Sequence, residues 1–222
     1  VGGPHITALP EETMKLFGSF DLGIIGEGED TIRELIRALE GGGNPSGTSG
    51  IIWRDDGDKV LKTTPRSFIK QLDDLPFPAW DLLEDFPRSY LPPPFRFKKL
   101  PAAYLVTTRG CPYHCIFCDR SVFGNKCRGH SAGYILALIE YLRSAFGIRE
   151  ILFEDDTFVT FKGTLLEVCE GLLKQGMRIS WSCLGRADSV SPDLLRLMKR
   201  AGCWSISYGI ETGDERVMKF IG

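Results

Sequence analysis

The sequence predicts an α/β protein whose second half is a parallel β-sheet covered by helices. From residue 101 onward, short apolar segments alternate with amphipathic segments, and four such strand–helix pairs follow one another. The predicted strands are almost continuously apolar, which is typical of parallel strands buried on both faces. Right-handed crossovers between them leave two architectures open, a doubly wound sheet or a closed or partial (β/α) barrel.

The individual elements of this series follow from hydrophobic periodicity and from helix start signals. Ser191 and Pro192 are typical of an N-cap and of the first position of a helix. Strands are expected at 102–108, 150–155, 178–184 and 203–210, and helices at 132–146, 163–176 and 191–202, with one more helix beginning near 213.

The first hundred residues predict a different organisation. An apolar strand at 21–25 ends in the turn GEGED, and a helix follows at 31–40 with Asp30 as its expected N-cap. Residues 50–64 predict a hairpin, and the Pro-rich, aromatic segment 65–100 predicts an extended strap packed over a domain surface. We therefore expect an α/β domain over 1–45, a hairpin and Pro-rich connection over 46–100, and the strand–helix series over 101–222.

Composition argues against several classes of protein. The 222 residues include 27 Lys and Arg against 29 Asp and Glu, which gives a formal net charge of −2 and no basic excess for nucleic acid. No apolar run approaches the roughly 18 residues that span a bilayer, and no N-terminal segment resembles a signal peptide. We expect a cytoplasmic protein that binds neither membrane nor nucleic acid. Because the chain lacks an initial Met and ends within a predicted helix, we also expect a fragment of a longer protein.

Three of the seven cysteines lie within eight residues, in the segment RGCPYHCIFCDR just after the first strand of the series. In βα architectures the carboxyl ends of the strands carry the chemistry, because the loops converge there. An odd number of cysteines in an unexported chain favours a metal or redox site over a disulfide framework. A structural zinc site would need a fourth ligand beside Cys111, Cys115 and Cys118, and the candidates are His114, Cys127 and His130.

An iron–sulfur cluster fits three thiolates better than zinc does. A 4Fe–4S cluster is normally held by four thiolates, so three leave one iron with an open position. An open position is typical of a catalytic metal site. The loop must fold tightly to present three thiolates, and Gly110 and Pro112 beside the first cysteine suit such a turn.

The pattern C-x3-C-x-aromatic-C, here CPYHCIFC, resembles the radical SAM superfamily. The resemblance implies a partial barrel, with about four of the usual six βα units present, and a 4Fe–4S cluster on the three clustered cysteines. In that superfamily the open iron chelates S-adenosylmethionine, and an electron from the cluster cleaves it to methionine and a 5′-deoxyadenosyl radical. The resemblance thus implies an enzyme with an electron donor such as flavodoxin or ferredoxin, acting on a small molecule that the sequence does not identify.

The resemblance also implies contacts with S-adenosylmethionine at the ends of the later strands. Where many members have a Gly-Gly-Glu turn, this chain has FEDDTF, whose paired acids suit an ammonium group. Arg186 would bind the carboxylate with bidentate geometry, although pairing with Asp188 is the alternative. Phe117 would pack near the adenine, and Glu211 would accept from the ribose. The remaining implied contacts are Asp155, Asp156, Thr157, Ser182 and Tyr208.

The N-terminal segments VGGPH, FDLGIIGEGEDTIRELI and LDDLPFPAWDLL resemble one subgroup, in which a doubly wound cobalamin-binding domain precedes the barrel. That subgroup includes methyltransferases and the anaerobic oxidative cyclase of chlorophyll biosynthesis. The resemblance implies backbone contacts to the cobalamin nucleotide tail at Gly2, Gly3, Gly26 and Gly28. The Asp-x-His-x-x-Gly loop that ligates cobalamin is absent from this chain, and His5, expected to follow a strand, lacks that context. Whether cobalamin binds is left open.

The leading interpretation is a radical SAM enzyme that performs methyl transfer, cyclisation or rearrangement. One alternative is a methylthiotransferase-like radical SAM protein, which would need a second cluster with its own three cysteines, but residues 1–110 contain none. The other is a non-catalytic zinc-binding module. The four scattered cysteines are expected to be structural: Cys127, Cys169, Cys183 and Cys203.

Overall fold

The structure is a computed structural model that describes residues 1–221, and its contacts divide the chain into two compact units. The first unit comprises residues 1–70 and 117–126, and the second comprises 71–116 and 127 onward. The contacts therefore group the hairpin with the first 45 residues. The domain boundaries expected near residues 45 and 100 stay predictions.

The second unit is built on a four-stranded parallel sheet, as the sequence predicts. Strands β4 (Ala102–Leu105), β7 (Glu150–Phe153), β8 (Ser180–Gly185) and β9 (Cys203–Tyr208) are hydrogen-bonded in that order. A doubly wound sheet reverses its strand order at a switch point, whereas a barrel adds its strands in chain order. The observed order is therefore that of a partial barrel.

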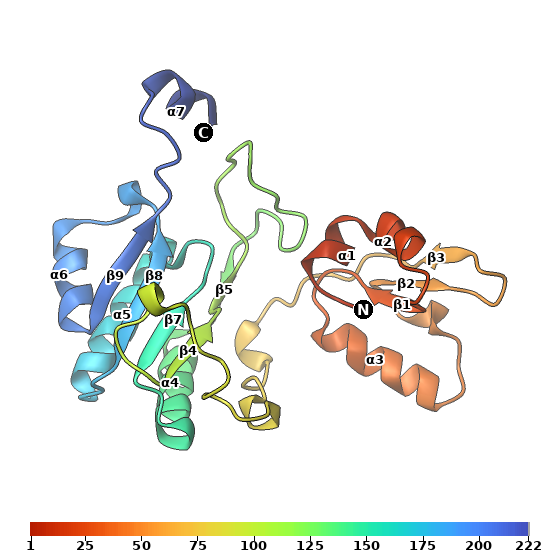
Figure 1. Ribbon diagram of the computed structural model, residues 1–222, viewed down its shortest axis with the longest axis horizontal. Helices are drawn as coiled ribbons and strands as arrows, with labels where there is room; N and C mark the ends of the chain where they lie inside the picture. Colours follow the sequence, from red (N-terminus) through yellow and green to blue (C-terminus); the bar gives the residue numbers. More distant parts are fainter. Residues whose placement is uncertain (222) are drawn as a thin grey trace. The chain divides into compact units, whose positions relative to one another are not determined.

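Helices cover one face of this sheet (Figure 1). They are α4 (Ala132–Phe146), α5 (Lys162–Lys174) and α6 (Pro192–Arg200), and a further helix, α7 (Glu215–Ile221), follows β9. Ser191 caps α6 by accepting a hydrogen bond from the Leu194 N–H, which confirms the predicted helix start. No helix in the described part of the chain has both the length and the hydrophobicity to cross a bilayer.

The core of the second unit lies between these helices and the sheet. The indole of Trp181 meets the ring of Phe153 edge to face, with centroids 5.7 Å apart. The alternate residues of β8 that face the helices are buried, which follows from the two-residue period of a strand. Three of the four cysteines expected to be structural are buried in this core: Cys169, Cys183 and Cys203.

The Pro-rich segment is the strap that its composition predicts, and it packs on α4. Phe77 meets Tyr134 edge to face at 5.0 Å, and Phe86 meets Phe146 in the same way at 5.1 Å. Trp80 is buried in the same core as the sheet. Short 3-10 turns along the chain are η1 (Pro45–Gly47), η2 (Leu72–Asp74), η3 (Trp80–Leu82), η4 (Pro94–Arg96), η5 (Phe158–Thr160) and η6 (Ala187–Ser189).

The first unit contains an antiparallel sheet of three strands and three helices. The strands are β1 (Leu22–Ile24), β2 (Ile51–Arg54) and β3 (Val60–Lys62), paired in that order, so the predicted hairpin is confirmed. The helices are α1 (Pro4–Ala8), α2 (Pro10–Leu16) and α3 (Glu29–Glu40). Val1 runs beside β1, because the Ile24 N–H donates to the Val1 carbonyl at 2.8 Å.

Two expectations for the first unit are wrong. Helix α3 begins at Glu29 with Gly28 as its N-cap, so Asp30 lies inside the first turn, where it pairs with Arg33. His5 lies within α1 and does not follow a strand, because Pro4 occupies the first helical position and starts a helix there.

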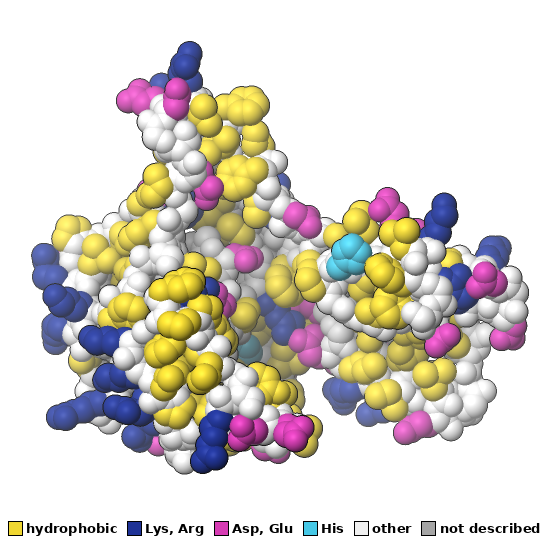
Figure 2. Space-filling view, in the orientation of Figure 1, with side chains coloured by type: hydrophobic (Ala, Val, Ile, Leu, Met, Phe, Trp, Pro, Cys, Tyr) yellow, Lys and Arg dark blue, Asp and Glu magenta, His cyan; other side chains and the backbone are white. Residues whose placement is uncertain are grey.

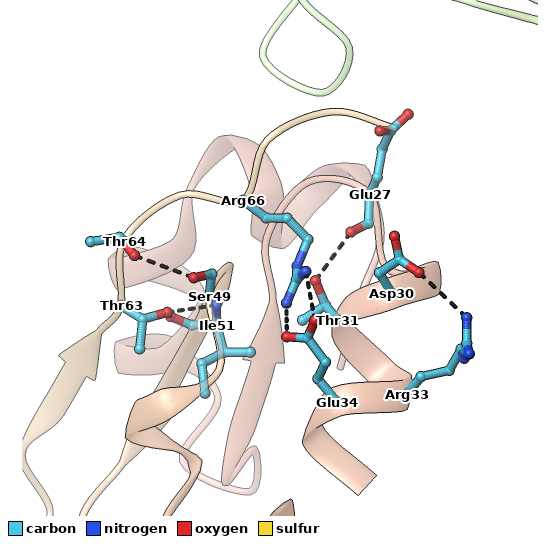
Figure 3. A network of polar contacts seen from close by, with 10 residues as sticks. All are labelled: Glu27, Asp30, Thr31, Arg33, Glu34, Ser49, Ile51, Thr63, Thr64 and Arg66. Carbon is cyan, nitrogen blue, oxygen red and sulfur yellow. Dashed lines mark hydrogen bonds and ion pairs between the residues drawn. The ribbon is translucent and has the colours of Figure 1, made fainter. Parts of the chain in front are cut away.

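A polar network holds the segment after the hairpin against α3 (Figure 3). Arg66 forms a two-pronged ion pair with Glu34, one contact of which is 3.1 Å. The Glu27 carboxylate accepts from the Ile69 N–H at 2.7 Å. Gly50 has a φ of +78°, and a Cβ there would lie 3.1 Å from the Cβ of Arg66, so the close approach of this segment favours glycine.

Candidate functional site

The cysteine segment is a loop that a short ladder closes at its base. Strand β5 (Thr108–Arg109) pairs antiparallel with β6 (Arg128–Gly129) on either side of the loop. Gly110, directly before Cys111, has a φ of +86°, in the left-handed region that glycine adopts readily. The loop leaves from the carboxyl end of the parallel sheet, where the sequence places it.

Asp155 fixes the base of this loop through hydrogen bonds to the two threonines that precede it. Its carboxylate is fully buried and accepts hydrogen bonds from the backbone N–H and the hydroxyl of both Thr107 and Thr108, the Thr107 N–H at 2.7 Å. Burial raises the pKa of Asp155 to about 6, although the hydrogen bonds from the two threonines oppose the rise. In this structure the carboxylate faces the loop base, and its implied contact with an ammonium group stays a prediction.

The two residues that follow Asp155 differ in their surroundings. Asp156 is exposed, and it acts with burial and with Cys111 to raise the pKa of the Cys127 thiol. Asp156 and Cys111 therefore each lie within electrostatic range of the Cys127 thiol. Thr157 is buried, and within residues 1–221 its hydroxyl has no hydrogen-bond partner. A buried hydroxyl without a partner is unusual, so it is a candidate contact for a bound molecule.

The strap holds the other side of the loop base. Asp73 accepts from His130 Nδ1 and from the Ser131 N–H, both at 3.0 Å. The imidazole of His130 stacks on Tyr134 with 3.9 Å between centroids. Burial lowers the pKa of His130, and the carboxylate of Asp73 opposes this effect. The fold thus fixes the orientation of this ring through Nδ1 and one ring face, and a zinc ligand at His130 would have to be Nε2.

Arg186, just beyond the end of β8, reaches the cysteine loop. Its Nη1 lies 3.8 Å from the Cys115 Sγ, and its Cζ lies 4.1 Å from the centroid of the Tyr113 ring. The Tyr113 hydroxyl lies 3.1 Å from the Ser189 Oγ. The loop and the segment after β8 thus meet through three side-chain contacts. Sequence reasoning missed Tyr113 and Ser189, because no local pattern marks partners 76 residues apart.

Arg186 also pairs with Asp188, which was the alternative that the sequence left open. Nε lies 3.2 Å from Oδ1 and Nη2 lies 3.0 Å from Oδ2. The hydrogen bond with Arg186 lowers the pKa of Asp188, and the same bond raises the pKa of Arg186. The implied contact of Arg186 with a cosubstrate carboxylate stays a prediction.

The other residues expected to contact S-adenosylmethionine occupy separate places. Ser182 lies within β8 between two residues that face the helices, so its side chain faces the uncovered side of the sheet. Tyr208, the last residue of β9, is half-buried. Glu211 is exposed and has a φ of +59°. Phe117 is 56% exposed and belongs to the first unit.

Two of the expected cobalamin-contact glycines meet at one side chain of the first unit. The Thr7 hydroxyl donates to the Gly3 carbonyl at 2.9 Å and accepts from the Gly26 N–H at 3.0 Å. A Cβ added at Gly2, Gly3 or Gly26 would meet no atom within 4 Å, so a ligand could approach the backbone at these positions. Gly28 differs, because it caps α3 and its Cβ position lies 3.6 Å from Ile24.

The donor set of the loop suits an iron–sulfur cluster. None of the seven cysteines forms a disulfide, and of the clustered three, Cys111 and Cys115 are half-buried and Cys118 is exposed. Thiolates are soft ligands that favour iron–sulfur clusters, and one of the three thiols, that of Cys115, lies beside the Arg186 guanidinium. Among the described residues no three His, Cys, Asp or Glu side chains converge into a metal centre, so ligation by these cysteines stays a prediction.

Sequence comparison identifies the family of the chain and several similar proteins. Residues 105–222 match the radical SAM superfamily. The chain is 35% identical to an uncharacterised methyltransferase of Pyrococcus horikoshii over all of this chain and 47% of that protein. It is 28% identical to the anaerobic magnesium-protoporphyrin IX monomethyl ester cyclase of Synechocystis, over 90% of this chain and 39% of that protein. The chain thus spans less than half the length of these relatives.

Solved structures resemble the whole chain. The cobalamin-dependent S-adenosylmethionine radical enzyme OxsB, with aqua-cobalamin and S-adenosylmethionine bound, matches 100% of this chain and 32% of that chain, with a TM-score of 0.79 and 27% identity. The methyltransferase TsrM from Kitasatospora setae matches 98% of this chain and 42% of that chain, with a TM-score of 0.74. At 16% identity the second likeness supports the fold alone.

Proposed function

The chain belongs to the radical SAM superfamily, and from that premise we propose that the protein holds a 4Fe–4S cluster on Cys111, Cys115 and Cys118 and cleaves S-adenosylmethionine reductively. When bound, the cluster would supply the electron that yields methionine and a 5′-deoxyadenosyl radical. The protein is then an enzyme that starts radical chemistry on a small-molecule substrate. The proposed activity is that of the whole protein, because the chain spans less than half the length of these relatives.

The observation that carries the proposal is the contact between Arg186 and Cys115. These residues are 71 positions apart, and a structural thiol in a loop needs no cation beside it. The β5–β6 ladder and the Asp155 carboxylate hold the base of the same loop in one conformation. A loop fixed in this way presents its thiols with little loss of conformational freedom on binding.

Two further residues suit the cosubstrate. Asp156 is exposed within electrostatic range of Cys127, in the loop that carries the three clustered cysteines, and offers a carboxylate to the ammonium group of S-adenosylmethionine. The unpartnered hydroxyl of Thr157 is a suitable neighbouring contact. Ser182, Tyr208, Glu211 and Phe117 remain proposed contacts that rest on the family resemblance.

We propose methyl transfer, cyclisation or rearrangement as the reaction, in line with the names of the relatives. Cobalamin is part of this proposal. OxsB is similar over the whole chain and was solved with aqua-cobalamin bound, and the open backbone at Gly2, Gly3 and Gly26 suits the approach of a nucleotide tail. The Cβ position of Gly28 lies 3.6 Å from the Ile24 side chain, so Gly28 suits such a contact less well.

The electron donor that we propose is a small acidic redox protein such as flavodoxin or ferredoxin, and the compartment is the cytoplasm. In Figure 2, Lys and Arg side chains gather on the side of the second unit where α6 lies. Helix α6 contributes Arg196, Lys199 and Arg200 to that surface. Complementary charge accelerates the encounter of redox partners, so weaker electron transfer at high salt is expected.

Anaerobic reconstitution with iron and sulfide tests the proposal. We expect about four irons per chain and a visible absorbance band, as a cubane cluster requires. Cys115→Ala should abolish both signals. Cys127→Ala is the matched control, because it removes a thiol of the same loop that lies outside the triad, and it should retain the cluster. Zinc at unit stoichiometry without iron would instead identify a zinc-binding module.

A further inference from the structure

We propose that Arg186 donates a hydrogen bond to the Cys115 thiolate and thereby raises the reduction potential of the cluster, and that its planar edge does not bind the carboxylate of S-adenosylmethionine. The inference deepens the proposed function and rests on it, since it requires the cluster. It assigns Arg186 a task different from the one that the family resemblance implies.

The bidentate edge of the Arg186 guanidinium is already occupied by Asp188. Bidentate recognition of a carboxylate needs two parallel N–H groups, and Nε and Nη2 both point to Asp188, at 3.2 and 3.0 Å. A cosubstrate carboxylate would have to displace Asp188 from this edge. The Asp188 side chain is 61% exposed, so water screens its charge more than that of Arg186, which is 33% exposed.

The remaining nitrogen of the guanidinium lies beside the Cys115 sulfur. One face lies over the Tyr113 ring at 4.1 Å, and the Tyr113 hydroxyl contacts Ser189, so the ring holds the plane of the guanidinium in place. The remaining nitrogen, Nη1, then lies 3.8 Å from the Cys115 Sγ, within the range of an N–H···S contact. Asp188 and Tyr113 thus act as positioning residues for Arg186.

A positively charged donor at this sulfur should raise the reduction potential of the cluster. Reduction adds one negative charge to the cluster, and a hydrogen bond to a ligand sulfur stabilises the more negative state. A guanidinium keeps its charge at every accessible pH, so its effect on the reduction potential should not depend on pH. Loss of this donor should therefore make the cluster harder to reduce, even with no S-adenosylmethionine present.

The test is a potentiometric titration of the reconstituted protein, followed by electron paramagnetic resonance and carried out without S-adenosylmethionine. Arg186→Gln should lower the midpoint potential by at least ~59 mV, which corresponds to a tenfold change in a one-electron equilibrium. Arg143→Gln is the matched control, because it removes an arginine that is likewise bidentate to a carboxylate, that of Glu140 on α4, and should leave the potential unchanged. Equilibrium dialysis with S-adenosylmethionine gives the affinity of the same two variants.

An unchanged potential in Arg186→Gln, together with a tenfold or greater loss of affinity for S-adenosylmethionine, would overturn the inference and assign Arg186 to the carboxylate. If Arg186→Gln does not take up iron, Tyr113→Leu decides the question. That variant changes no charge but removes the ring that holds the guanidinium of Arg186 in place, so its potential should fall, and an unchanged or higher value contradicts the inference. Wild-type protein that takes up no iron contradicts the proposed function itself, and the inference fails with it.

Discussion

Strand β7 has a buried carboxylate at each end, Glu150 at its first residue and Asp155 two residues beyond its last. Glu150 accepts from the backbone N–H groups of Lys98 and Lys99 and from the indole of Trp204. Asp155 accepts from the N–H and hydroxyl groups of Thr107 and Thr108. The two ends of the strand therefore use the same device, a buried carboxylate that satisfies the backbone of a neighbouring segment.

The difference between the two ends lies in what each carboxylate holds. At the amino end it holds the strap, which only covers the sheet, and at the carboxyl end it holds the loop with the three cysteines. A strand-end acid thus acts on the site by fixing the base of the loop that carries the cysteines. Substitutions of Glu150 and Asp155 should therefore both lower the stability of the protein, but only the substitution of Asp155 should lower its iron content.

The largest effect is expected for Asp155→Ala. It leaves the buried donors of Thr107 and Thr108 unsatisfied, which should lower the free energy of unfolding by about 4 kcal/mol. Urea denaturation measures this change, and iron content after reconstitution should fall in parallel because the loop base is no longer fixed. Full iron content in a destabilised Asp155→Ala protein would show that the loop does not depend on this carboxylate.

Glu150→Ala should destabilise the protein by a similar but smaller amount, about 3 kcal/mol, because water can reach the strap N–H groups that it exposes. Iron content should stay at the wild-type level, since the cysteine loop is anchored at the other end of β7. The measurements are those made for Asp155→Ala. Equal loss of iron in both variants would mean that the two ends do not act separately.

The pH dependence of stability tests the environment of Asp155 further. The pKa of Asp155 rises from 3.8 to about 6 on folding, so the folded protein binds this proton more tightly than the unfolded chain does. Its contribution is complete below pH 3.8 and is lost as the pH rises through 6. At 1.36 kcal/mol per pKa unit, wild type should lose about 2 kcal/mol relative to Asp155→Asn between pH 4 and pH 7. Parallel pH profiles of the two proteins would contradict this assignment.

The smallest effect is expected for Asp73→Asn, on the strap side of the loop base. Asp73 accepts from the Ser131 N–H at the start of α4, and an amide oxygen can replace one such acceptor, so the loss should be about 1 kcal/mol. Thermal unfolding measures it. Without the carboxylate, which raises the pKa of His130, that pKa should fall further, as NMR titration of the ring would show.

The sequence predicted the parallel sheet and its helices well, because hydrophobic periodicity and the cap at Ser191 act over a few residues. It placed the cysteine loop and Arg186 at the same edge of the sheet, because the carboxyl ends of parallel strands meet there. The partial barrel came from the family resemblance, and the strand order supports it.

The sequence did not predict which way Asp155 faces. That direction depends on Thr107 and Thr108 in the neighbouring segment, 48 and 47 residues away. Tyr113 and Ser189 were missed for the same reason, since a long-range side-chain contact leaves no periodic signal. The two short Pro-led helices of the first unit were also missed, because five and seven residues are too few for a periodic pattern.

The bond between Asp155 and the loop base has a consequence for the order of events during folding. The threonines and the aspartate meet only after β4 and β7 have paired in parallel, which requires an intervening crossover through α4. Contacts of such long sequence separation form slowly, because loop closure has to precede them. We therefore expect the nascent chain to complete its sheet before its three thiols are arranged, so that iron is acquired by a folded protein and does not direct the folding itself.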